Sequence, residues 1–428
     1  MITPDLLTDS TRADGAHIDL GTLRNLRAQD LRPGPLPVTM PSAVTASPPL
    51  VIARPSLADD RVRADTRNWI AARAGQYRAA DPGDEALLHA VETSVLGRPP
   101  VADTARAIDA NLAEVYLWLA RRWLDLARGS ADPRYLNAAL KLLSVCLVAP
   151  LPPTELAADT LARALEALDT VTVHPPRPST PPPAAEFAAG AAAPAGAREP
   201  RIAVLAGADS RGLPQFLAAA RNLPVVGVVL HEDGQRAQPP GSAYTSAWYP
   251  APRGTRLRPA PEPSSVPHYR VHHRDWAAAA AHLAAWDTDL LVLIGMDVVP
   301  ASVLGVPRLG TINAHNGALP GYRGMDAVAW AVLAGDPVVC SVHHATADVD
   351  AGNVLATCEV PTGAVDLRQA VKDTQLQLLT DVCRRVSTTG VLPEGRSQSG
   401  AARRYYRMHP ALRQHLDAAT PRLTGAAS

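Results

Sequence analysis

The chain has 428 residues, of which 47% are apolar, and its 41 Lys and Arg residues balance its 41 Asp and Glu residues. One hydrophobic core stops growing near about 250 to 300 residues, so this length indicates two or more domains. The balanced charge gives no net field that would attract a polyanion, which argues against a nucleic-acid partner.

The four cysteines lie far apart in the sequence and form no CxxC pair: Cys146, Cys340, Cys358 and Cys383. This pattern fits neither a zinc site nor a disulfide scaffold, and the spacing of His and Cys predicts no metal site. The sequence begins without a basic segment and apolar core, and no apolar run reaches the about 18 residues of a membrane span. We therefore expect a cytoplasmic protein without a membrane partner.

The N-terminal part divides into two segments of different pattern. Residues 1–57 mix Pro, polar and short apolar stretches without periodicity, which predicts an extended or poorly ordered segment. Residues 58–173 have helical spacing, most clearly in a stripe formed by Leu112, Val115, Tyr116, Leu119, Trp123 and Leu126. Asp132 and Pro133 fit the N-cap and first position of a further helix. With helical patterns at 85–96 and 154–168, this segment predicts an all-α helical bundle.

The apolar face of such a bundle more often forms a packing or dimer surface than a ligand site. Self-association is therefore one expectation for this domain. Docking of a carrier protein is the alternative, because residues 174–200 are rich in Pro, Ala and Gly and predict a flexible linker to the next domain.

After the linker, apolar runs at 201–206, 225–230 and 290–294 predict strands that are buried on both faces. Helical patterns at 213–221 and 276–286 separate them. Strand, helix and strand in this order predict parallel βαβ units. We therefore expect an α/β, Rossmann-like parallel-sheet domain over residues 201–410, followed by a C-terminal tail at 411–428. Residues 239–267, rich in Pro and Ser, are expected at its surface.

Two segments of this domain carry polar groups suited to acyl transfer. Asn313 and His315 are two residues apart in a predicted strand and therefore project to the same side. About thirty residues later, Asp350 ends an acidic loop and is the natural carboxylate partner of His315. An amide, an imidazole and a carboxylate can stabilise an oxyanion and accept a proton. Alone, an Asn-x-His pair is usually incidental, and His343 or Asp348 alone would be a strand histidine or a solvated charge.

Taken together, these segments resemble the folate-dependent formyltransferases, a family that includes the glycinamide ribonucleotide, methionyl-tRNA and sugar N-formyltransferases. The resemblance covers about half of the chain, residues 201–410. It is carried by five markers in order: Asp289–Gly295, Gly310–His315 with Leu319–Gly324, Trp330, Ser341–His343, and Asp350–Gly352.

The resemblance implies roles for individual residues. Asn313 would hydrogen-bond the formyl oxygen, His315 would stabilise charge or shuttle a proton, and Asp350 would tune His315; His343 would support them. The donor would be 10-formyltetrahydrofolate, bound by two loops that comprise Met296, Asp297, Val298 and Val299, and Ala347, Asp348 and Val349. The acceptor would lie against Asn316, Gly317, Tyr322 and Arg323. No metal is implied.

The activity implied is transfer of a formyl group to a primary amine of a small molecule, such as an amino sugar, an amino acid or a biosynthetic intermediate. The turn Gly207–Gly212 has only two glycines and an acid, which argues against a riboside phosphate. Too few residues follow Val360 for the C-terminal barrel domain of the methionyl-tRNA enzyme. A formyltetrahydrofolate hydrolase is one alternative, although its relatives carry a second histidine where Asn316 stands. A non-catalytic folate-binding or scaffold protein is the other.

Overall fold

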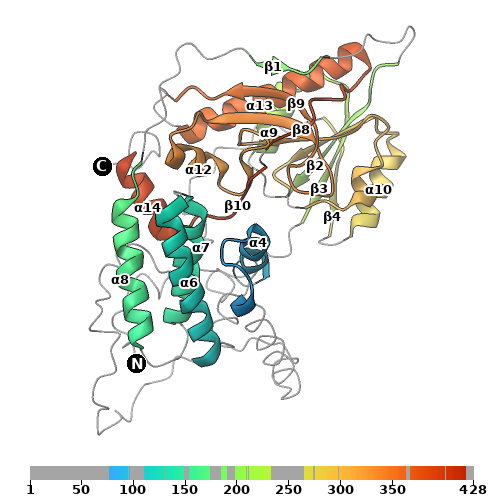
Figure 1. The fold of residues 1–428 in the computed structure, drawn as a ribbon. Coiled ribbons are helices and arrows are strands. Elements are labelled where there is room, and N and C mark those ends of the chain that lie inside the picture. Colours follow the sequence, from blue (N-terminus) through green and yellow to red (C-terminus); the bar gives the residue numbers. More distant parts are fainter. Residues whose placement is uncertain are drawn as a thin grey trace, which may run out of the picture. The chain divides into compact units, whose positions relative to one another are not determined.

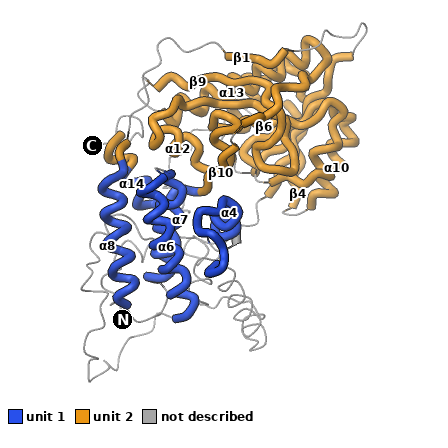
Figure 2. The backbone as a smooth tube through the Cα atoms, in the orientation of Figure 1, with its two compact units in different colours: residues 1–171, 240–253, 407–415 blue, residues 172–239, 254–406, 416–428 orange. Residues whose placement is uncertain are grey.

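The computed structural model describes two single residues, 96 and 210, and twelve ranges: 77–94, 110–130, 132–148, 154–173, 185–189, 198–208, 212–232, 265–272, 275–296, 298–362, 367–400 and 402–420. They belong to two compact units (Figure 2). The helical unit comprises residues 1–171, 240–253 and 407–415, and the α/β unit comprises the rest. The predictions for residues 1–57, for Asp297 and for almost all of 239–267 lie outside the described residues.

In the described part of the helical unit, four helices lie at the positions that the periodicity predicts (Figure 1): α4 (Glu85–Ser94), α6 (Ala110–Ser130), α7 (Pro133–Val148) and α8 (Glu155–Thr170). The stripe on α6 is buried from Leu112 to Trp123. The Asp132 carboxylate accepts a hydrogen bond from Arg134 N at 3.0 Å where α7 begins. These helices thus form because their apolar faces are buried, and the Asp132 cap adds to the stability of α7.

The C-terminal end of the chain differs from the prediction. Residues 407–415 belong to the helical unit, and the segment expected as a tail begins with a helix, α14 (Pro410–Ala419). His409 N donates to Asn137 Oδ1 at 2.6 Å, and the His409 ring lies 3.0 Å from Ser144 Oγ. The buried side chains of Leu412 and Leu416 explain why this segment packs as a helix.

A buried ion pair joins two helices of the helical unit. Lys141 Nζ lies 2.6 Å from Glu92 Oε2, and the two side chains are 2% and 1% exposed. Asn137 Nδ2 donates to the other carboxylate oxygen at 3.2 Å. Burial raises the pKa of Glu92, while Lys141 and Asn137 act in the opposite direction. Each charge therefore depends on the other for compensation.

We expect Glu92→Ala to lower the free energy of unfolding by about 3 to 5 kcal/mol, because the buried Lys141 would lose the Glu92 carboxylate. Urea denaturation followed by circular dichroism measures this loss. Glu114→Ala, at an exposed position of α6, is the control and should change stability by less than about 0.5 kcal/mol. The double variant Glu92→Leu, Lys141→Met should be more stable than Glu92→Ala; equal losses in both would contradict the explanation.

The α/β unit is built on a mixed sheet with the strand order β1-β9-β8-β6-β5-β2-β3-β4. The strands are β1 (Glu186–Phe187), β2 (Ile202–Gly207), β3 (Val225–His231), β4 (His268–Val271), β5 (Leu290–Ile294), β6 (Gly310–His315), β8 (Val339–His344) and β9 (Val354–Glu359). The neighbours β6, β5, β2, β3 and β4 are parallel to one another. On the other side of β6, the strands β8, β9 and β1 each pair antiparallel with the preceding strand. The unit has the predicted Rossmann-like α/β fold, extended by an antiparallel edge.

The sequence prediction of a linker over 174–200 is wrong at one point. β1 lies within it and pairs with β9, and the Arg385 guanidinium stacks 3.9 Å above the Phe187 ring. Residues 186 and 187 are therefore ordered by pairing with the edge strand β9 and by the contact of Phe187 with Arg385, although the composition of this segment predicts a flexible linker.

Helices flank the sheet (Figure 1): α9 (Gly212–Ala219), α10 (Trp276–Ala285), α11 (Ala301–Leu304), α12 (Ala327–Ala334) and α13 (Leu367–Thr389). α13 packs on β6, β8 and β9, and α10 packs on β3 and β4. No helix in the described ranges is long and apolar enough to cross a membrane.

The strand order places a topological switch between β2 and β5, because the chain builds outward from β2 in both directions. Open α/β sheets bind ligands beyond the carboxyl ends of strands at such a switch. β6 lies beside β5, so its carboxyl end, with Asn313 and His315, opens on the same edge.

Candidate active site

The antiparallel pairing of β6 and β8 brings four side chains of the site together. Asn313 is paired with His343, and His315 is paired with Ser341. Residues paired in this way lie side by side on the same face of a sheet. The Asn313 and His315 side chains, two residues apart, therefore share a face with His343 and Ser341.

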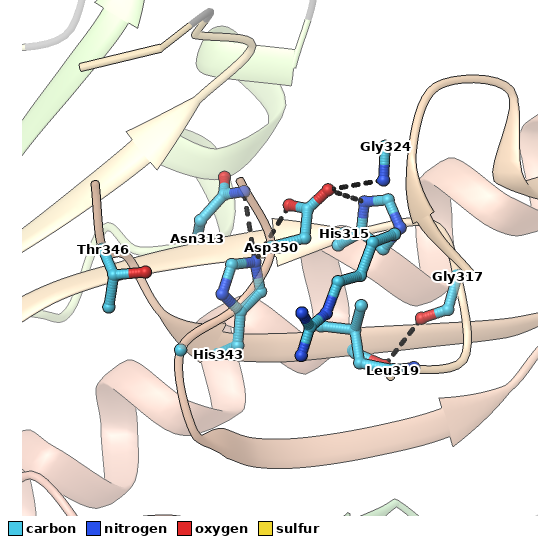
Figure 3. Close-up of polar contacts among 12 residues, drawn as sticks. Asn313, His315, Gly317, Leu319, Gly324, His343, Thr346 and Asp350 are labelled. Atoms are coloured by element: carbon cyan, nitrogen blue, oxygen red, sulfur yellow. Dashed lines mark hydrogen bonds and ion pairs between the residues drawn. The ribbon is translucent and has the colours of Figure 1, made fainter. Parts of the chain in front are cut away.

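Asp350 joins these strands from a separate loop (Figure 3). Its Oδ2 lies 3.4 Å from His315 Nδ1, and its Oδ1 lies 3.4 Å from His343 Nε2. Gly324 N donates a hydrogen bond to Oδ2 at 2.9 Å. The carboxylate is only 9% exposed. The structure thus brings together the three residues predicted as catalytic, with His343 beside them.

His315 is fixed in one orientation by the backbone. Its Nε2 lies 2.6 Å from the carbonyl oxygen of Tyr322, which can only accept, so Nε2 carries the proton. Nδ1 is therefore the nitrogen that faces Asp350. Burial lowers the pKa of His315 below its ordinary 6.5, and the Asp350 charge offsets part of this effect. The imidazole is neutral at neutral pH, with a lone pair on Nδ1.

The Asp350 carboxyl is ionised. Burial favours its neutral form, but contacts with His343 and His315 and the hydrogen bond from Gly324 N outweigh burial and lower its pKa. A charged carboxylate next to Nδ1 stabilises a proton that arrives there. The pair can therefore accept a proton from a bound group and hold it.

Asn313 completes the set of polar groups. Its Nδ2 lies 3.4 Å from His343 Nε2, and the His343 Nδ1 proton is donated to the carbonyl oxygen of His344 at 2.8 Å. The side chain of Asn313 is half-buried. An amide nitrogen carries two protons, so contact with His343 leaves a second donor for a ligand.

The four residues predicted to contact an acceptor occupy different environments. Asn316 is half-buried, and its Oδ1 has no hydrogen-bond partner among the described residues. Gly317 is buried, and its carbonyl oxygen accepts from Ser341 Oγ at 2.7 Å. The Tyr322 hydroxyl donates to Asp336 at 2.5 Å, and the Arg323 guanidinium donates to Gln398. Of these four residues, Asn316 has a buried side-chain oxygen without a partner among the described residues, which leaves it open to a ligand.

The two loops predicted to hold the donor also differ in exposure. After β5, Met296 is half-buried against the core, Val299 is 4% exposed, and Val298 is 64% exposed. In the second loop, Ala347 and Asp348 are exposed and Val349 is half-buried. Val299 belongs to the core, so the surface available to a ligand comes from its neighbours.

Sequence reasoning missed two side chains that support the site. Ser341 Oγ donates to Gly317 O and lies 3.5 Å from Leu319 N, which fixes the loop after β6. Gln398 Nε2 donates to the carbonyl oxygens of Asp350 and Gly352. The alternation that selects His343 also selects Ser341, two residues earlier on β8, but no local pattern marks Gln398.

Comparison with known proteins agrees with this geometry. The formyl transferase family model matches residues 228–382. This match supports a formyltransferase family for these residues. The predicted resemblance to the formyltransferase family is therefore confirmed for this part of the chain, which contains Asn313, His315 and Asp350.

Several relatives of this part of the chain are methionyl-tRNA formyltransferases. The protein of Nitrosococcus oceani is 34% identical over 145 residues, which are 32% of this chain and 45% of the relative. That of Novosphingobium aromaticivorans is 32% identical over 155 residues, which are 33% of this chain and 52% of the relative. The chain thus spans about half the length of these relatives. Among solved structures, glycinamide ribonucleotide transformylase 1 from Symbiobacterium toebii is 26% identical, covering 44% of this chain and 84% of its own, with a TM-score of 0.31.

These relatives contradict the expectation of a small-molecule acceptor with no nucleic-acid partner, because their names specify a charged tRNA. The expectation relied on the charge balance of the whole chain and on the small number of residues after Val360. A sum of charges does not report how they are distributed, and a few local cations suffice for phosphate contacts. Arg403 and Arg404 are both exposed. Arg404 is the strand partner of Arg323, and Arg323 precedes Gly324, whose N–H donates to Asp350.

We expect the His315 imidazole to titrate below its ordinary pKa of 6.5, and at still lower pH in Asp350→Asn. The carboxylate charge favours the imidazolium, so its removal lowers the pKa further, whereas the amide preserves the shape of the side chain. NMR titration of labelled histidines measures both values. A His315 pKa that rises or stays constant in Asp350→Asn would contradict the assigned pairing.

Gly317→Ala should disturb His315. A Cβ at this position would lie 2.7 Å from His315 Nε2 and 2.6 Å from Tyr322 O, the two atoms that form the orienting hydrogen bond. We expect a loss of about 1 to 3 kcal/mol in the free energy of unfolding and a changed His315 NMR signal. Gly321→Ala is the control, since its Cβ would have no neighbour nearer than 3.5 Å. Similar behaviour of both variants would contradict this explanation.

Proposed function

We propose that the protein is an N-formyltransferase that moves the formyl group of 10-formyltetrahydrofolate to a primary amine. The observation that carries the proposal is a buried, ionised Asp350 facing the free Nδ1 of His315, with Asn313 on the same face of a formyl transferase domain. Acyl transfer to an amine needs an oxyanion donor and a proton acceptor. Asn313 and His315 have these two properties.

The described residues beside the triad fit a folate donor. Met296 and the exposed Val298 offer apolar surface at the end of β5, and the exposed Ala347 and Asp348 offer polar backbone groups on the other loop. A pterin needs both an apolar contact for its ring and polar groups for its edges. We therefore keep these loops as the proposed donor site.

In the proposed reaction the donor supplies a formyl carbon, whose bond to the folate nitrogen is replaced by a bond to the amine nitrogen. Asn313 Nδ2 donates to the formyl oxygen as negative charge develops there. His315 Nδ1 takes the proton that the attacking nitrogen loses and returns it to the departing nitrogen. Asp350 stays charged at 3.4 Å from Nδ1 and stabilises the imidazolium between these two transfers.

Asn316 is placed to contact the incoming amine. Asn316 directly follows His315 in the sequence. Its side-chain oxygen is buried without a partner among the described residues. A buried carbonyl oxygen without a donor is costly, and an amine N–H would remove that cost. We propose that Asn316 orients the acceptor nitrogen toward the formyl carbon.

For the acceptor we propose an amine carried on a charged tRNA. The support is that the relatives found are methionyl-tRNA formyltransferases. The exposed Arg403 and Arg404, of which Arg404 is paired through its backbone with Arg323, add positive charge for contact with a phosphate. The four cysteines are free thiols, the state expected in a reducing compartment, and the proposal accordingly includes a cytoplasmic location.

The test supplies 10-formyltetrahydrofolate labelled in the formyl carbon together with methionyl-tRNA. We expect label in the acid-precipitable fraction, released as N-formylmethionine by mild base, and a rate lower by about 10² to 10⁴ in His315→Ala. Uncharged tRNA is the control and should take up no label. Formate release at the same rate without any amine would indicate a hydrolase, and the absence of both products with folded protein would refute the proposed function.

A further inference from the structure

The backbone of Asp350 has a conformation that needs external support. Its φ is +53°, in the left-handed region that residues other than glycine seldom adopt. Asp350 lies in the loop between β8 and β9, and its side chain must reach His315 and His343 from there. Such a conformation persists only where surrounding contacts hold it.

Gln398 supplies the principal contacts to this part of the backbone. Its Nε2 donates to the carbonyl oxygen of Asp350 at 2.8 Å and to that of Gly352 at 2.6 Å. The two protons of one amide group thus span the turn that Asp350 begins. Gln398 is 48 residues from Asp350 in sequence, so this contact exists only in the folded α/β unit.

The amide of Gln398 is itself oriented by Arg323. Arg323 Nε and Nη2 both donate to Gln398 Oε1, at 2.9 and 2.7 Å. This fixes which end of the amide faces the Asp350 loop. Arg323 directly precedes Gly324, whose N–H binds the Asp350 carboxylate. The side chain and the backbone of Asp350 are therefore both held from the same strand, β7 (Arg323–Gly324).

The chain around Gln398 is attached to the β8–β9 region at several points. Arg396 and Val354 exchange two backbone hydrogen bonds of 2.8 Å. Asn353 Nδ2 donates to Glu394 O at 3.0 Å, and His344 Nε2 lies 2.9 Å from Pro393 O. Residues 393–396 are thus hydrogen-bonded to His344, Asn353 and Val354, which flank the acidic loop. These contacts keep Gln398 within reach of Asp350.

We propose that Gln398, oriented by Arg323, is a positioning residue that keeps the Asp350 carboxylate against His315 and His343. Arg323 then acts through Gln398, in place of the acceptor contact that the sequence predicted for it. The kcat measurement below rests on the proposed function. The measurement of the His315 pKa rests only on the pairing of Asp350 with His315.

The decisive variant is Gln398→Glu. It keeps an oxygen for Arg323 but replaces the donor with a second oxygen, which would face the two carbonyl oxygens of Asp350 and Gly352. We expect kcat for formyl transfer to fall about 10- to 100-fold, as a displacement of about 1 Å in a catalytic group does. The His315 pKa should fall further, because the carboxylate charge moves away from Nδ1.

Gln377→Ala is the matched control, since Gln377 is exposed on α13 and its amide bonds to Asp381 on the same helix. It should keep the kcat and the His315 pKa of the unmodified protein. Arg323→Leu should resemble Gln398→Glu, and combining it with Gln398→Ala should add little to either single loss. Thermal unfolding by circular dichroism confirms that each variant is folded.

A folded Gln398→Glu with unchanged kcat and an unchanged His315 pKa would overturn the inference. The NMR titration separates this failure from a failure of the proposed function. If the unmodified protein transfers no formyl group, the proposed function is refuted, while the response of the His315 pKa to Gln398→Glu still tests the role of Gln398.

Discussion

One buried charge, the carboxylate of Asp350, accounts for much of the arrangement around the site. A buried carboxylate is tolerated only if nearby groups compensate it. Here Gly324 N on β7 donates a hydrogen bond to it, and the imidazoles of His315 on β6 and His343 on β8 lie 3.4 Å from its two oxygens, where a proton on either ring balances its charge. The compensating groups are also the polar groups of the site, so the contacts that make the loop stable are those that assemble the chemistry.

Much of this could be predicted from local pattern. Unbroken apolar runs predict the buried strands β2, β3 and β5, because a strand covered on both faces needs no polar alternation. The period of two places Asn313 and His315 on one face. Asp350 needed more, since its partnership with His315 came from chemical complementarity and from a family resemblance, and the structure places its carboxylate 3.4 Å from His315 Nδ1.

What could not be predicted depends on contacts between distant segments. Nothing near Gln398 in the sequence indicates that its amide would meet the Asp350 loop. Likewise, Arg323 was predicted to contact the acceptor, yet its guanidinium donates two hydrogen bonds to Gln398 Oε1. The same holds for residues 407–415, which join the helical unit although they follow the α/β unit in sequence. The sequence pattern indicates which residues can be buried. Which residues they contact depends on how distant segments come together in the fold.

Burial and the Asp350 charge act on His315 in opposite directions, and their combination suits proton transfer. Burial keeps the imidazole neutral, so that Nδ1 has a lone pair to offer. Once a proton arrives, the carboxylate at 3.4 Å stabilises the imidazolium without having to move. A site that is already arranged for the charged state avoids reorganisation during the reaction. The backbone hydrogen bond from His315 Nε2 to Tyr322 O adds to this, because the ring cannot turn its other nitrogen toward the substrate without losing that bond.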